Sequence, residues 1–147
     1  MEPAITWLVR YGHVVAASIW VGGYALLALV IVPLLARGAS EALVGLAATS
    51  VRVLTYAGTA TIFFGILLIA RTRGFASMGG GEWGILVSAS FAAAIVLMGI
   101  GDGALRPALA RLGETGDGAA ARRWAMIGFI ITVLTVGLMT RAVYAGS

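Results

Sequence analysis

Four long apolar runs dominate this chain, and they constrain its fold more than any other feature. We expect them to cross a lipid bilayer as spans of about 5–35, 51–71, 83–105 and 124–144. Roughly 20 apolar residues suffice to cross the hydrocarbon core as a helix, and each run reaches that length. The polar segment 111–123 between the last two runs predicts a solvated loop.

The composition supports a membrane location. The chain is 61% hydrophobic and 11% charged, with a mean hydropathy of +1.02. A soluble domain carries roughly 25% charged residues, so the outer surface of this protein must face lipid. Since only helices and closed barrels satisfy the backbone in lipid, and no strand alternation persists, we predict an all-α integral membrane four-helix bundle. Residues 1–147 then form a single transmembrane domain.

Two further properties of the composition exclude classes of function. The chain has no cysteine, which excludes disulfides, thiolate metal sites and cysteine nucleophiles. All ten basic residues are arginine, and the sequence pI is near 10.4. Arginines of membrane proteins concentrate at lipid phosphates, so we expect the lipid bilayer as a partner and no nucleic acid.

The arginines also predict an orientation in the inner (plasma) membrane. Cytoplasmic loops carry an excess of basic residues. More arginines lie in or beside the first and third loops than on the opposite side, so both termini are predicted to be extracytoplasmic. The larger group is Arg37, Arg52, Arg106, Arg111, Arg122 and Arg123, and the smaller is Arg10, Arg71, Arg73 and Arg141.

His13 is the only histidine, and it lies about two turns into the first run. Positions three, four and seven residues further on share its helix face, which places Ala16, Ala17 and Trp20 beside it. Two small side chains and an aromatic one form a ledge on which a flat ring can lie. Neutral imidazole is a good ligand for haem iron. A histidine here can instead donate a hydrogen bond to a backbone carbonyl or a threonine, so both interpretations stay open.

The surroundings of His13 resemble a known family. His13, then Trp20-Val21-Gly22-Gly23 and Pro33-Leu34-Leu35, are similar to the first helix of the CopD-like family of small membrane proteins. That group extends to the HemJ-type protoporphyrinogen oxidases. The resemblance is clearest over residues 9–37, and Arg52 at the start of the second span agrees with it. It implies a four-helix bundle in which His13 binds haem b.

The chain departs from this family in the third span. HemJ-type enzymes carry a lysine there, whereas this chain has no lysine at all. The corresponding stretch, residues 83–91, offers only Ser88 and Ser90 as polar groups. We therefore do not expect porphyrin-oxidising activity, and whether the protein is an enzyme stays open. A haem site with a single histidine remains compatible with the sequence.

Other residues are candidates for further haem contacts. Haem carries two propionates, and the guanidinium fork of arginine matches a carboxylate. Arg10, Arg71 and Arg141 lie in the same predicted leaflet as His13. Met139 lies at roughly the depth of His13 and is a candidate second axial ligand, although methionine also serves as a filler of apolar cores.

These features lead us to expect an integral membrane haem b protein for electron transfer, haem handling or sensing of a small gas. The alternative is a cofactor-free subunit for metal transport, with copper as the metal, or an accessory subunit. Glycines recur inside the spans, and small residues let helices approach closely. A homodimer is therefore also compatible with the sequence.

Overall fold

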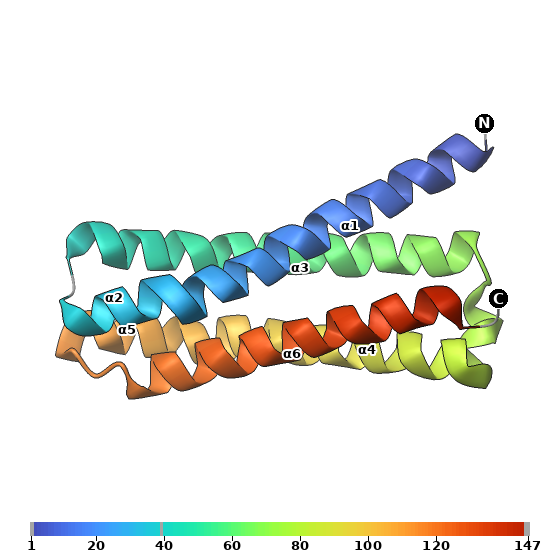
Figure 1. Ribbon diagram of the computed structural model, residues 1–147. Coiled ribbons are helices and arrows are strands. Elements are labelled where there is room, and N and C mark those ends of the chain that lie inside the picture. Colours follow the sequence, from blue (N-terminus) through green and yellow to red (C-terminus); the bar gives the residue numbers. More distant parts are fainter. Residues whose placement is uncertain (1, 39, 146–147) are drawn as a thin grey trace.

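The computed structural model describes residues 2–38 and 40–145, which form a bundle of helices (Figure 1). Four helical stretches are long and apolar enough to cross a membrane: Pro3–Arg37, Glu41–Arg71, Gly81–Thr115 and Ala119–Tyr144. The described part of the chain contains no strand. The predicted all-α four-helix membrane bundle is thereby confirmed.

Two of the four stretches contain a π-helical turn. The first consists of α1 (Glu2–Leu26), the turn η1 (Leu27–Ile31) and α2 (Val32–Arg37), and the third of α4 (Gly81–Gly99), the turn η3 (Ile100–Leu105) and α5 (Arg106–Thr115). The second and fourth stretches are the unbroken helices α3 (Glu41–Arg71) and α6 (Ala119–Tyr144). A 3-10 turn, η2 (Phe75–Gly79), lies between α3 and α4.

Each π-helical turn is followed by a proline, with one residue between them. Pro33 and Pro107 lie in the first turn of α2 and α5. A proline inside a helix lacks an N–H donor, and its ring clashes with the carbonyl of the preceding turn. The wider π-helical turn accommodates the ring, so the helix does not end. The third stretch therefore continues to Thr115, whereas the sequence predicted that the span stops before Pro107.

The prediction of a loop over residues 111–123 is wrong for most of that segment. The connection is only three residues long, because α5 ends at Thr115 and α6 begins at Ala119. Gly116 closes α5 in the left-handed conformation with φ 77°, which glycine adopts without strain. The N–H of Ala119 then donates to Asp117 Oδ1 at 3.1 Å. Buried Leu109 and Leu112 keep α5 helical by packing one of its faces.

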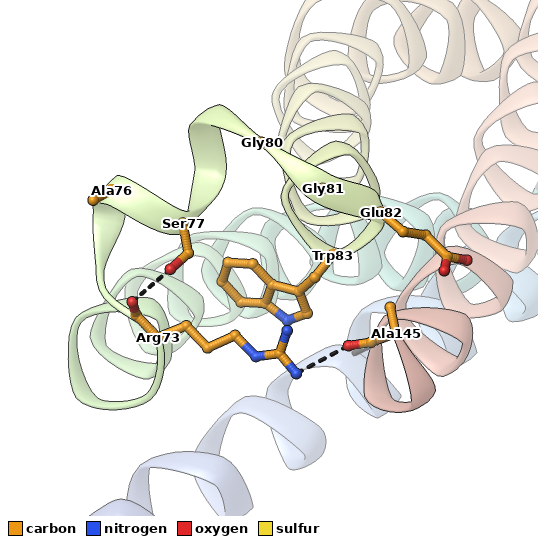
Figure 2. Close-up of a pocket in the computed structure, with 8 residues that line it drawn as sticks. All are labelled: Arg73, Ala76, Ser77, Gly80, Gly81, Glu82, Trp83 and Ala145. Carbon is orange, nitrogen blue, oxygen red and sulfur yellow. Dashed lines mark hydrogen bonds between the residues drawn. The ribbon is translucent and has the colours of Figure 1, made fainter. Parts of the chain in front are cut away.

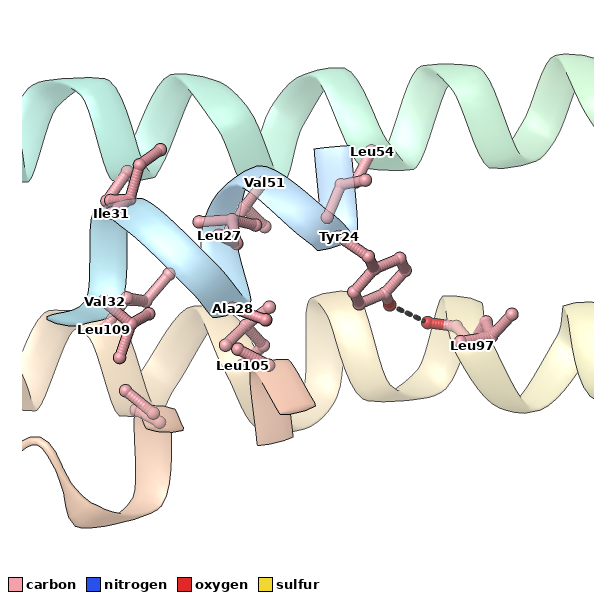
Figure 3. Close-up of a cluster of buried hydrophobic side chains, with 14 of the residues drawn as sticks. Tyr24, Leu27, Ala28, Ile31, Val32, Val51, Leu54, Leu97, Leu105 and Leu109 are labelled. Carbon is pink, nitrogen blue, oxygen red and sulfur yellow. Dashed lines mark hydrogen bonds between the residues drawn. The ribbon is translucent and has the colours of Figure 1, made fainter. Parts of the chain in front are cut away.

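The main hydrophobic core lies in the half of the bundle near the α2–α3 and α5–α6 connections (Figure 3). Tyr24, Leu27, Leu97 and Leu105 are completely buried there. The Tyr24 hydroxyl donates a hydrogen bond of 2.7 Å to the Leu97 carbonyl oxygen, which joins α1 to α4. Gly128 on α6 makes room for the Tyr24 ring, because any side chain at that position would overlap it.

The other half of the bundle is packed less tightly. Its core is a cluster of Ile69, Val87 and Ala142 from α3, α4 and α6. The first half of α1 diverges from α6 toward the N-terminus (Figure 1). The start of α1 and the end of α6 lie at the same end of the bundle (Figure 1), as four spans require. Which side of a membrane this end faces stays a prediction.

Candidate functional site

His13 lies where α1 packs against α3. Its ring atom Nδ1 is 3.0 Å from the carbonyl oxygen of Thr61. Because a carbonyl oxygen only accepts, Nδ1 carries the proton, and in the neutral ring Nε2 then holds a lone pair. Gly65 permits this approach, since a Cβ at that position would lie 3.3 Å from His13 Cε1.

The second ring nitrogen of His13 is left available. The hydrogen bonds of the described residues include Nδ1 of His13 and not Nε2. Within residues 2–38 and 40–145, every fully buried side-chain nitrogen or oxygen has a hydrogen-bond partner. Since Nε2 has no such partner, it is not fully buried, in agreement with the half-buried ring. The hydrogen bond to a backbone carbonyl, raised above as the alternative to metal binding, is thus present. It occupies Nδ1 and leaves Nε2 without a hydrogen-bond partner among the described residues.

The direction in which His13 faces follows from its helix. Eleven residues separate His13 from Tyr24, and at 100° per residue they lie about 20° apart around the axis of α1. Tyr24 packs against Gly128 of α6 and is completely buried. Toward the N-terminus α1 diverges from α6 (Figure 1), and His13 is only half-buried. His13 thus lies on nearly the same side of α1 as Tyr24, but unlike Tyr24 it is not completely covered.

The neighbours of His13 on α1 have different surroundings. Ala16 is buried and Ala17 half-buried. Trp20 is only 5% exposed, and its ring packs on Gly58 of α3, where a Cβ would lie 2.8 Å from Trp20 Cε2. Trp20 thus serves the contact between α1 and α3, whereas Ala17 is small and only half-buried.

Arg10 and Arg71 are exposed arginines at this end of the bundle. Arg10 precedes His13 by one turn of α1, and Arg71 is the last residue of α3. Neither side chain forms an ion pair or hydrogen bond with another described residue. Both guanidinium groups are consequently available to an anionic ligand.

Two other arginines at this end stabilise the bundle, and Figure 2 shows one of them, Arg73. Arg141 Nε forms an ion pair of 2.6 Å with Glu82 Oε1, which joins α6 to α4. Arg73 donates a hydrogen bond of 2.9 Å to the Ala145 carbonyl oxygen and stacks over the Trp83 ring at 5.2 Å. Of the predicted propionate partners, Arg141 is thus already engaged by a carboxylate.

Arg73 and Trp83 line a cavity of about 440 Å³ between η2, the start of α4 and the end of α6 (Figure 2). Glu82 and Ala145 also line it, and His13 does not. Met139 lies in the hydrophobic cluster of Ile69, Val87 and Ala142. That placement matches the interpretation of this methionine as a core filler.

The protein ligands available for a metal at His13 suit one kind of metal site better than another. In the described part of the chain, no group of three His, Cys, Asp or Glu side chains gathers to hold a metal ion. A bare zinc or copper ion takes several protein ligands, whereas the porphyrin supplies four ligands to haem iron and the protein needs to add only one. A single accessible imidazole nitrogen therefore fits haem better than it fits a bare ion.

Asp102 is a candidate residue that the sequence analysis did not select. It lies in η3, where Thr55 Oγ1 of α3 is 3.0 Å from Oδ1 and 3.2 Å from Oδ2. Arg106 Nη2 is 2.7 Å from Oδ1. The signal was present, because a carboxylate inside an apolar run is costly and marks a functional site by default. Its position near the predicted end of the third span concealed it.

Comparison with known protein families, with characterised proteins and with solved structures found no match for this chain. The CopD-like resemblance rests on the first helix, and it stays a prediction.

Proposed function

We propose that this chain is an integral membrane haem b protein in which Nε2 of His13 binds the iron. The observation that carries the proposal is the hydrogen bond of 3.0 Å between His13 Nδ1 and the Thr61 carbonyl oxygen. Histidines that bind a metal characteristically donate their other N–H to a carbonyl or carboxylate, which orients the ring and selects the tautomer. That partner is in place here, and Nε2 has none among residues 2–38 and 40–145.

The surroundings of His13 support the same proposal. His13 is only half-buried, and Ala17, four residues further along α1, is small and half-buried as well. The free guanidinium groups of Arg10 and Arg71 supply cations for the two propionates. Bound haem supplies one-electron chemistry and a site for a small gas. The chain contributes the axial ligand, its orientation and the charges that hold the propionates.

An absorption spectrum of the purified protein with added haem tests this function. We expect a Soret band in the wild type and its loss in His13→Ala. Imidazole added to His13→Gly should restore the band, because the free ligand replaces the missing side chain. Gly22→Ala is the matched control on α1, since a Cβ there meets no atom within 4 Å, and it should keep the band.

Two outcomes would overturn the proposal. If His13→Ala keeps the Soret band with unchanged haem per protein, His13 is not the ligand. If the wild type stays colourless after haem is added, while copper binding depends on His13, the cofactor-free metal-transport subunit is the better description.

A further inference from the structure

An exposed ion pair lies at the start of α5. This position is at the end of the third apolar run that is distant from the chain termini. Asp102 and Arg106 are one helical turn apart, and their side chains are 40% and 57% exposed. Thr55 Oγ1 of α3 lies 3.0 Å and 3.2 Å from the two carboxylate oxygens of Asp102, and its one hydroxyl hydrogen can donate to either of them. The carboxylate is thus positioned by a second helix, and part of it still faces outward.

Two exposed glycines lie beside this pair. Gly99 precedes Asp102 by about one helical turn and Gly103 follows it directly, and a Cβ at either position would meet no atom within 4 Å. Packing between the helices of this chain therefore does not require these glycines. Their absent side chains leave free surface next to the two charges, where another molecule can approach the backbone.

The depth of the pair follows from the length of the apolar run. Trp83 opens the third apolar run, and tryptophan concentrates at membrane interfaces. About 20 helical residues cross the hydrocarbon core, so the opposite boundary lies close to Asp102. Trp124 of α6, with Arg123 stacked over its ring at 5.3 Å, belongs to the same boundary. Asp102 and Arg106 therefore lie at the level of the lipid headgroups.

The charges of Asp102 and Arg106 complement a lipid headgroup that carries one negative and one positive group. A guanidinium has five N–H donors, and the contact to Asp102 Oδ1 is the one hydrogen-bonded ion pair that Arg106 forms among the described residues. Its remaining donors suit a phosphate. The carboxylate of Asp102 keeps acceptor capacity for an ammonium group.

We propose that Asp102 and Arg106 bind the headgroup of a zwitterionic aminophospholipid, with its phosphate on Arg106 and its ammonium on Asp102. This site is independent of haem binding at His13. A primary ammonium donates three hydrogen bonds, whereas a quaternary choline ammonium donates none. The site therefore prefers ethanolamine lipids to choline lipids, because only the former donate to the carboxylate that Thr55 holds in place.

Native mass spectrometry of the full chain in detergent, with equal amounts of dioleoyl phosphatidylethanolamine and dioleoyl phosphatidylcholine, tests the site. We expect the wild type to retain the ethanolamine lipid about tenfold over the choline lipid, which is the size of one charge-assisted hydrogen bond. Asp102→Asn should reduce this ratio to near one. Arg106→Gln should weaken binding of both lipids, because it removes the phosphate partner.

Arg111→Gln is the matched control, since Arg111 is an exposed arginine of the same helix, α5. It should leave the lipid ratio unchanged. Equal retention of the two lipids by the wild type would overturn the proposal, and so would an undiminished preference in Asp102→Asn. The proposal would also be overturned if the wild type bound a second copy of the chain in place of lipid and Arg106→Gln lost that copy. Arg106→Gln leaves the hydrogen bond between Thr55 and Asp102 intact, so it covers the case in which Asp102→Asn does not fold.

Discussion

The two halves of the bundle differ in how tightly their helices pack. The half near the α2–α3 and α5–α6 connections contains the main core, with Tyr24, Leu27 and Leu97 completely buried. The half near the termini has only the small cluster around Ile69, and there α1 diverges from α6 (Figure 1). The proposed haem ligand lies in the loose half. The tight half holds the helices together, and the proposed ligand lies outside its core.

The physical reason for this difference lies in the solvent. Helices inside the hydrocarbon core gain little from burying apolar groups, because lipid tails are equally apolar. The tight half includes α5, which carries polar residues on one face and buried Leu109 and Leu112 on the other. Beyond the hydrocarbon core, water drives such faces together. Water therefore favours the packing of α5, whereas the core around Tyr24 and Leu97 depends on the close contact that Gly128 permits and on the hydrogen bond between α1 and α4.

The largest expected effect is that of Gly128→Val in the tight half. A side chain at this position would overlap the buried Tyr24 ring, so we expect a loss of about 3 kcal/mol in the free energy of unfolding. Thermal unfolding in detergent measures it. Gly137→Val is the control on the same helix, because a Cβ there meets no atom within 4 Å. A similar stability for both variants would show that the Tyr24 contact is not tight.

A pair of core truncations compares the two halves directly. Leu112→Ala in the tight half and Ile69→Ala in the loose half remove the same number of carbon atoms. We expect costs of about 3 and about 1 kcal/mol, because the cavity penalty depends on how well the surroundings can relax. Denaturant unfolding in mixed micelles measures both. Equal costs would contradict the division of the bundle into a tight and a loose half.

The smallest effect concerns the hydrogen bond at the centre of the tight half. Tyr24→Phe removes the donor to the Leu97 carbonyl, and we expect a loss of about 1 kcal/mol in unfolding free energy. Tyr56→Phe is the matched control, since Tyr56 is 69% exposed. The same thermal unfolding assay compares them. An equally large loss in Tyr56→Phe would show that the Tyr24 hydrogen bond does not contribute specifically to stability.

Part of this organisation could be predicted from residues alone. The apolar runs predicted four helices, which the structure confirms. The haem ligand predicted at His13 stays a prediction. The continuation of the third stretch past Pro107 could not be predicted, because a proline usually ends a helix and only the π-helical turn before it avoids the clash. Trp20 and Met139 were expected near a ligand. Both contribute to helix packing, which depends on partners far away in the sequence.

The sequence by itself determined that the chain is helical and spans a membrane, because the length and polarity of each run must match the thickness of the lipid. Tertiary structure decided which groups remain free for chemistry. The carbonyl of Thr61 lies 48 residues from His13, and it selects the ring nitrogen that carries the proton. Thr55 lies 47 residues from Asp102, and it positions that carboxylate. No local pattern specifies such pairings, since they arise only when separate helices pack side by side.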